Sequence, residues 1–169
     1  MAIPDSRSGK DTFVELCQRY LLWCGNISTV DFVKSVAKYC GWDGEKTPKN
    51  RAFLSDLKDL LTQWDDVPYK RVAREIALKE AECHCQDYST KDLVIFIHCR
   101  EPEEIARFVR DYGAITLFMS RPDVDGGPAS NHADAQVVNY DYDYTIVNDG
   151  TIEELEDKAV VFIHDVLGL

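Results

Sequence analysis

The sequence predicts an α/β fold in which a parallel sheet lies between helices on both faces, giving three layers. Short apolar segments at 93–97, 114–119 and 142–147 are typical of strands, and the first is apolar without interruption, as in strands covered on both sides. Stretches with helical spacing of apolar residues separate them. Because strands that alternate with helices form parallel sheets, we expect ligands to bind beyond the carboxyl ends of the strands.

Six helices are expected, and most have recognisable end signals. Threonine or serine three residues before an acid predicts a helix start, and glycine predicts a helix end. In chain order, the expected helices cover 11–23, Asp31 to Cys40 behind the capping sequence that begins at Ser28, a segment that begins at Thr47 and Pro48, about Pro68 to Cys85, Pro102 to Gly113, and a last segment capped by Thr151 and Glu154.

The strand at 93–97, the helix from Pro102 and the strand at 114–119 predict a parallel, right-handed strand–helix–strand unit. A polar segment at about 120–137 follows, and it contains Gly126, Gly127 and Pro128, so we expect a mobile loop of the kind that forms a lid. The turn at 148–150 precedes the last helix.

Composition limits the size of the fold and its partners. A chain of 169 residues with 45% apolar content predicts one domain with one substantial core. The formal charge of −11 and the isoelectric point near 4.7 argue against DNA or RNA polymers as partners. Neither a membrane span nor a signal-like segment is recognisable, so a cytoplasmic protein is expected. A homodimer is compatible with the sequence.

The strongest functional motif lies near the N-terminus, where Gly9-Lys10-Asp11-Thr12 leads into a helix. A glycine-containing turn at a helix start offers backbone N–H groups and the positive end of the helix dipole to phosphate groups. The lysine adds a cation, as in the phosphate-binding loop G-x-x-x-x-G-K-[ST]. The expected nucleotide contacts are Arg7, Ser8, Gly9, Lys10, Asp11 and Thr12.

This motif departs from the common pattern in two respects. Pro4 stands where the first glycine belongs, and only Met1, Ala2 and Ile3 precede it, so the first strand is expected to be short or missing. The alternative interpretation is an ordinary helix start with Asp11 as a first-turn acid.

The six cysteines lack the spacing of a zinc site or a disulfide framework, and we expect most of them to be reduced core residues. The one cluster that suggests a metal is Cys83-His84-Cys85, but neighbouring residues on a helix point in different directions.

Segments along nearly the whole chain resemble the phage-type deoxynucleoside monophosphate kinases of the P-loop superfamily, with a looser likeness to phosphomevalonate kinases. The family pattern D-V-R-F-x-N-E corresponds to 98–104, the R-P pair to Arg121-Pro122, and N-D-G-T-x-E-E-L to 148–155. His132 resembles a histidine of the family's lid loop, and the segment at about 28–66 resembles its acceptor-binding region. One departure is His98, where the family has an aspartate.

The resemblance implies a kinase that transfers the γ-phosphate of ATP to a (deoxy)nucleoside monophosphate with Mg²⁺. Catalysis would depend on Lys10, Arg100 and Arg121, because phosphoryl transfer needs charge neutralisation above all. The acceptor phosphate would be held by Lys34, Arg51 and Arg100. Asp11 would replace the missing strand-end carboxylate as the metal ligand.

Other interpretations remain open. The three arginines are also explained as surface residues paired with acids, His98 as a structural histidine, and 140–144 as an ordinary alternating strand entrance. Two other functions compete with nucleotide phosphorylation: a non-catalytic P-loop protein that binds a nucleotide or a partner, and a kinase of another small phosphorylated metabolite. Cations behind several strand ends favour an enzyme.

Overall fold

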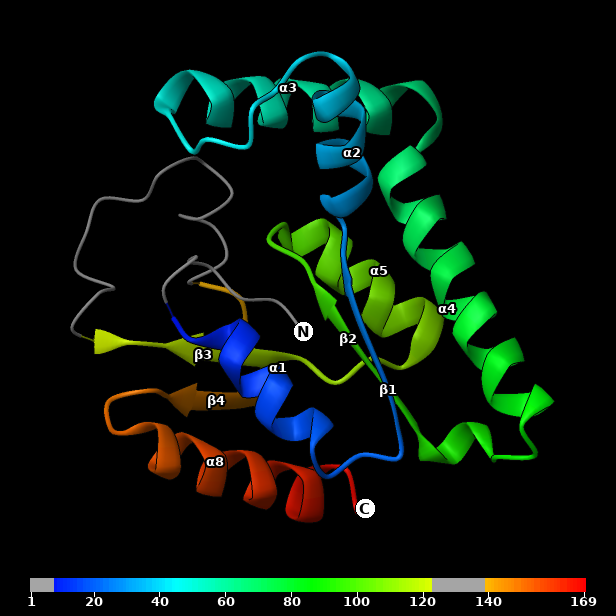
Figure 1. The fold of residues 1–169 in the computed structure, drawn as a ribbon, viewed down its shortest axis with the longest axis vertical. Helices are drawn as coiled ribbons and strands as arrows, with labels where there is room; N and C mark the ends of the chain where they lie inside the picture. The colour runs from blue at the N-terminus through cyan, green and yellow to red at the C-terminus, as the bar shows by residue number, and fades with distance from the viewer. Residues whose placement is uncertain (1–7, 123–138) are drawn as a thin grey trace.

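The structure is a computed structural model that describes residues 8–122 and 139–169. Within these ranges it is an α/β fold with six α-helices and two parallel two-stranded sheets (Figure 1). The elements, in order, are α1 (Lys10–Gln18), β1 (Trp23–Ser28), α2 (Asp31–Tyr39), α3 (Pro48–Asp65), α4 (Val67–Cys85), the short helix η1 (Thr90–Asp92), β2 (Leu93–His98), α5 (Pro102–Tyr112), β3 (Leu117–Ser120), β4 (Tyr144–Val147), α8 (Ile152–Val161) and the π-helical turn η2 (Phe162–Val166).

The expected single parallel sheet is present as two parallel pairs. β1 pairs with β2 from Trp23 opposite Leu93 to Ser28 opposite His98. β3 pairs with β4 over a shorter register that begins with Leu117 opposite Tyr144. In Figure 1 the strand directions turn progressively from β1 to β4, as in a twisted sheet.

Helices cover both faces of this layer, as the sequence predicts. Alternate residues of β2 enter two separate cores: Val94 and Phe96 pack in the core with α1 and α8, whereas Ile95 and Ile97 pack in the core with α4 and α5. Because successive strand residues point to opposite faces, β2 is the element that joins the two cores.

One strand was not expected from the sequence. The helix expected at 11–23 ends at Gln18, and Trp23 begins β1. This segment contains Gly25 and Asn26, which are uncommon in strands, so its sequence lacks a strand pattern. The strand conformation of this segment therefore comes from its pairing with β2. Gly25 packs closely there, since a Cβ at this position would lie 3.4 Å from the Ile95 side chain.

The elements of the strand–helix–strand prediction are present, but two of the expected strands begin later than predicted. The strand expected at 114–119 begins at Leu117, and the strand expected at 142–147 begins at Tyr144. Within the described ranges β2 and β3 do not pair with each other. Most of the loop expected at about 120–137 lies outside the described residues.

The expected helix ends are largely confirmed. The Thr47 hydroxyl accepts a hydrogen bond from the Asn50 N–H, and Thr151 and Glu154 form a complete capping box. Gly41 and Gly113 end their helices with φ of 93° and 63°. At α2 only half of the expected box forms, since the Ser28 N–H donates to Asp31 but the Ser28 hydroxyl accepts from Val30.

The third helix differs from its expected burial. Leu60 and Trp64, which belong to its apolar stripe, are 62% and 77% exposed. The buried residue is Lys58, whose ammonium donates to Glu101 at 2.7 Å and to Glu104 at 2.8 Å. Burial alone would lower the pKa of Lys58, but the two carboxylates outweigh it and raise that pKa. This charge cluster fastens α3 to the start of α5.

No helix in the described part of the chain combines the length and apolarity that crossing a membrane requires.

Replacing Lys58 with methionine should lower the free energy of unfolding by about 3 kcal/mol, because it leaves Glu104 buried without a countercharge. The measurement is urea unfolding followed by circular dichroism. As a matched control, Lys70→Met removes an exposed ion pair with Asp65 and should cost less than about 1 kcal/mol. Equal losses in both variants would contradict a structural role for the buried cluster.

Candidate functional site

The candidate site lies where α1 begins, beside the carboxyl ends of the strands. Gly9 has a left-handed φ of 83°, which turns the chain into α1, and Lys10 is the first residue of that helix. Phe13 and Val14 are fully buried in the core, so the orientation of the helix is fixed by packing. The first N–H groups of α1 have no carbonyl one turn earlier and are therefore suited to an anion.

The turn before α1 is held by Asn148, which directly follows β4. Its side-chain amide donates to the Ser8 carbonyl at 2.9 Å, and Ser8 itself is buried. A Cβ added to Gly9 would lie 2.3 Å from Asn148 Nδ2. Glycine is therefore required at position 9 both by its backbone conformation and by this close approach.

Lys10 is the cation of the site. Its side chain is only 13% exposed, and its Nζ lies 3.3 Å from the carboxylate of Asp11, which is largely exposed. The half-buried Thr12 completes the expected Gly-Lys-x-Thr sequence on the same first turn. Arg7, the remaining residue expected at the nucleotide, lies outside the described residues.

His98, at the carboxyl end of β2, belongs electrostatically to the same site. Its pKa is lowered to about 4, first by burial and then by the positive charge of Lys10. Its Nε2 lies 2.6 Å from the side-chain oxygen of Asn26 on β1. Its Nδ1 is buried and has no hydrogen-bond partner in the described ranges. At neutral pH the ring is therefore uncharged, and donation from Nε2 leaves a lone pair on Nδ1.

The residues expected to bind the acceptor phosphate lie farther apart than those at the start of α1. Lys34 on α2 lies 3.2 Å from Asp31, whose charge in turn acts on His98. Arg51 is exposed on α3, and no contact in the described part of the chain joins its side chain to Lys10. The structure thus brings Lys34 toward the strand ends but does not join Arg51 to them.

Two arginines follow the ends of different strands, as expected. Arg100 is the second residue after the end of β2, following Cys99, and it is half-buried. Arg121 comes directly after β3 and is exposed. Because both strands belong to parallel pairs with helices on both faces, these positions lie at the carboxyl ends, where α/β folds bind ligands.

The cysteines match the expectation of reduced core residues only in part. All six are free, but only Cys17, Cys83 and Cys99 are buried. Burial raises the pKa of Cys17 to about 12 and makes its thiol unreactive. Cys83 is buried while Cys85 is exposed, so the two do not point to one place. No group of three potential metal ligands gathers within the described ranges.

Three contributors to this region carried no clear sequence signal. Asn26 lies on the unexpected strand. Asn148 was expected in the turn at 148–150 and in the family-like sequence at 148–155, but not as a support of the turn before α1. Lys58 interrupts an apolar helix stripe. A lysine within an apolar stripe is the one pattern that could have been recognised, because a buried lysine needs acidic partners.

No protein-family model matches the chain, and no curated protein resembles it significantly. The likeness to P-loop kinases therefore depends on the residues of this chain alone.

The lowered pKa of His98 predicts an acid-sensitive native state. Between pH 6.5 and about 4 the unfolded histidine binds a proton that the folded one does not, so the free energy of unfolding should fall as the pH drops through this range. The loss assigned to His98 should be about 3 kcal/mol. It is measured as the difference between the unfolding free energies of the native protein and His98→Gln at each pH.

The matched control is His84→Gln, which removes an exposed histidine on α4 and should leave the pH profile unchanged. A His98→Gln profile with the same slope as the native protein would show that His98 titrates normally.

Proposed function

We propose that this protein is a P-loop kinase that transfers the γ-phosphate of ATP to a (deoxy)nucleoside monophosphate. The observation that carries the proposal is the left-handed Gly9 turn at the start of α1, with the poorly exposed Lys10 directly after it. This combination lies at the carboxyl edge of parallel strands, where a triphosphate would meet backbone N–H groups, a helix dipole and a cation together.

Charge distribution supports an anionic ligand at this place in particular. The chain carries 30 acidic residues against 19 lysines and arginines, so most of its surface repels anions. Lys10 is kept largely from solvent, and a partly buried cation attracts phosphate more strongly than an exposed one. Arg100 and Arg121, which follow separate strand ends, would add charge around the transferred group.

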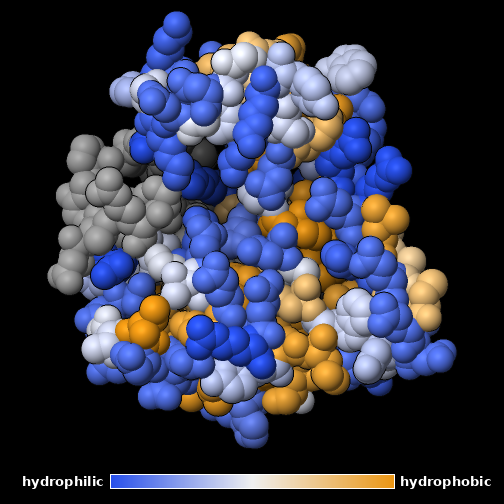
Figure 2. All heavy atoms as spheres, in the orientation of Figure 1, coloured by the Kyte–Doolittle hydropathy of each residue, from blue (hydrophilic) through white to orange (hydrophobic). Residues whose placement is uncertain are grey.

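The surface is hollowed beside the segment that we propose for acceptor binding. Figure 2 shows a hollow between the part of the molecule formed by α2 and α3 and the part that contains α1, and hydrophilic side chains surround much of it. Lys34 on α2 and Arg51 on α3 belong to the segment that we propose for acceptor binding. A guanidinium group suits a monophosphate because it offers two parallel N–H donors.

The site also contains one carboxylate, that of Asp11, which suits the Mg²⁺ ion of a magnesium nucleotide. Mg²⁺ binds few protein carboxylates and takes its other ligands from water and phosphate, so Asp11 alone could serve it. The metal would supply neutralisation of phosphate charge. His98 is a poor substitute for a carboxylate because it is neutral at pH 7, and we assign it no metal contact.

A non-catalytic nucleotide-binding protein is the second candidate. The observation that favours it is the neutral histidine at the end of β2, where the kinases that the sequence resembles carry an aspartate. Nucleotide binding needs Gly9 and Lys10. Phosphoryl transfer also needs further charges, placed correctly around the transferred phosphoryl group. The two candidates differ in one measurable result, the release of ADP.

The direct test incubates the protein with MgATP and each common ribonucleoside and deoxyribonucleoside monophosphate in turn, and it measures ADP release. Lys10→Ala should reduce transfer by a factor of about 100 or more, since it removes the main cation at the triphosphate. Lys79→Ala, on the exposed face of α4, is the matched control and should retain full activity. ATP binding without ADP release for any acceptor would favour the non-catalytic candidate, and activity that survives in Lys10→Ala would contradict the proposed site.

Asp11→Asn tests the metal assignment. Removing the carboxylate should raise the Mg²⁺ concentration needed for half-maximal nucleotide binding by about tenfold, because the metal loses a charged ligand. The measurement is titration of Mg²⁺ at fixed nucleotide. Glu15→Gln, an exposed acid on the same helix, is the control. An unchanged Mg²⁺ requirement in Asp11→Asn would remove Asp11 from the metal site.

A further inference from the structure

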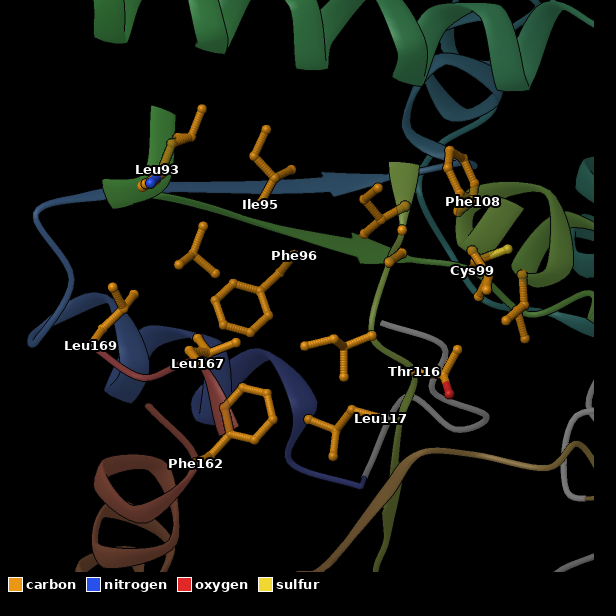
Figure 3. A pocket seen from close by; sticks show the side chains of 18 residues that line it. Leu93, Ile95, Phe96, Cys99, Phe108, Thr116, Leu117, Phe162, Leu167 and Leu169 are labelled. Carbon is orange, nitrogen blue, oxygen red and sulfur yellow. The ribbon is translucent and has the colours of Figure 1, made fainter. Parts of the chain in front are cut away.

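An open groove of about 800 Å³ lies between β4 and the last helix. Its less exposed lining is apolar and comes from Ile146 of β4 and from Phe162 and Val166 of η2. Figure 3 shows the Phe162 ring beside Leu117 and Leu167, with which it packs in the core of α1 and α8. The groove therefore has an apolar floor that the core supports, and we call it the β4 groove.

One side of the β4 groove is the outer edge of β4. Within the described ranges β4 pairs only with β3. The N–H groups of Tyr144 and Asn148 donate to carbonyls of β3 and of the residue before it, at 3.1 and 2.8 Å. Because the backbone groups of successive strand residues point to opposite edges, those of Thr145 and Val147 point away from β3. This edge therefore presents the hydrogen-bonding groups that a further strand requires.

One group of this edge is held by a lysine. The Lys158 ammonium donates to the Val147 carbonyl at 2.6 Å and to the Asp149 carboxylate at 2.9 Å. Lysines at strand edges limit uncontrolled pairing, because an incoming strand must displace them. The N–H and C=O of Thr145 have no such partner among the described residues. The edge is thus guarded at one carbonyl and open at its neighbour.

The other side of the β4 groove is acidic. Glu154 and Asp157 of α8 line it, and neither forms an ion pair in the part of the chain that the structure describes. The third carboxylate of the lining, Asp149, already pairs with Lys158, which is the one cation there. The groove is therefore negatively charged and attracts a cationic partner. A second copy of this chain, with a net charge of −11, brings like charges together and is disfavoured.

From this arrangement we infer that the β4 groove binds an extended basic peptide, which adds to the outer edge of β4 as a further strand and places lysine or arginine side chains beside Glu154 and Asp157. The aliphatic stems of these side chains cover the apolar floor, while their charged ends reach the acids of α8. The inference is independent of the proposed kinase activity, because neither Lys10 nor Arg100 lines this groove.

The test titrates the protein with a capped peptide, Arg-Val-Arg-Val-Arg-Val-Arg, by isothermal calorimetry and follows amide hydrogen exchange by mass spectrometry. The peptide should bind, should bind more weakly as salt is added, and should slow exchange in β4 but not in α3. Two control peptides separate the contributions. The Glu-Val peptide has the opposite charge, and the Arg-Pro peptide keeps the charge but lacks alternate N–H donors, so each should bind about tenfold more weakly or less.

Variants of the protein test the same contacts from the other side. Thr145→Pro removes an N–H of the outer edge without removing a bond to β3, and it should weaken peptide binding by about tenfold. Its matched control is Thr145→Val, which keeps the N–H and should bind normally. Asp157→Asn should weaken binding by about threefold, whereas Glu153→Gln, an exposed acid of α8 outside the groove, should not.

Lys158→Met gives a result in the opposite direction. It frees the Val147 carbonyl and removes a like charge, so it should strengthen binding of the Arg-Val peptide, and it keeps the test decisive if Thr145→Pro fails to fold. No binding of the Arg-Val peptide, equal binding of either control peptide, or unaltered binding by Lys158→Met would overturn the inference. So would protection of β4 that grows with protein concentration together with a dimer on size-exclusion chromatography, which would make a second copy the occupant.

Discussion

The structure depends on the requirement that β2 bury both of its faces. A strand whose successive residues Phe96 and Ile97 are both buried, on opposite faces, needs a helix layer on each side, and α1 with α8 and α4 with α5 supply these layers. Because helices cover both faces of β2, the chain can leave the strand layer only at the end of the strand. The loop after it, the start of α1 and the turn after β4 therefore gather at one edge, which is where the candidate site lies.

Buried electrostatic interactions shape that edge more than the acidic surface does. Lys58 pairs with both Glu101 and Glu104 and so fixes the segment that carries Arg100. Burial first, and then the charge of Lys10 directly after the Gly9 turn, lower the pKa of His98, so that this ring is neutral at pH 7. A protein with a net charge of −11 thus keeps cations partly buried at the ends of its strands. Partly buried charges are screened little by salt, so their effects on an anion would persist at physiological ionic strength.

The helices were predictable because their signals are local. Thr47, Thr151 with Glu154, and Gly113 act within one turn of the helix ends they define, so reading neighbouring residues was sufficient. The continuous apolar run of β2 was equally clear. β1 was not predictable, since Gly25 and Asn26 become strand residues only through pairing with a segment that begins seventy positions away from β1. The same distance explains why the contact between Asn26 and His98 was not foreseen.

The sequence by itself determined the fold class, the six helices of the described chain, and the Gly9-Lys10 turn at the start of α1, because each depends on residues close together along the chain. Tertiary structure decided which strands pair, that Lys58 is buried while Trp64 is exposed, and that Asn148 supports the turn at Ser8. These outcomes depend on segments that meet only after the chain has folded, and the free energy of burial and hydrogen bonding between them has no counterpart in any local pattern.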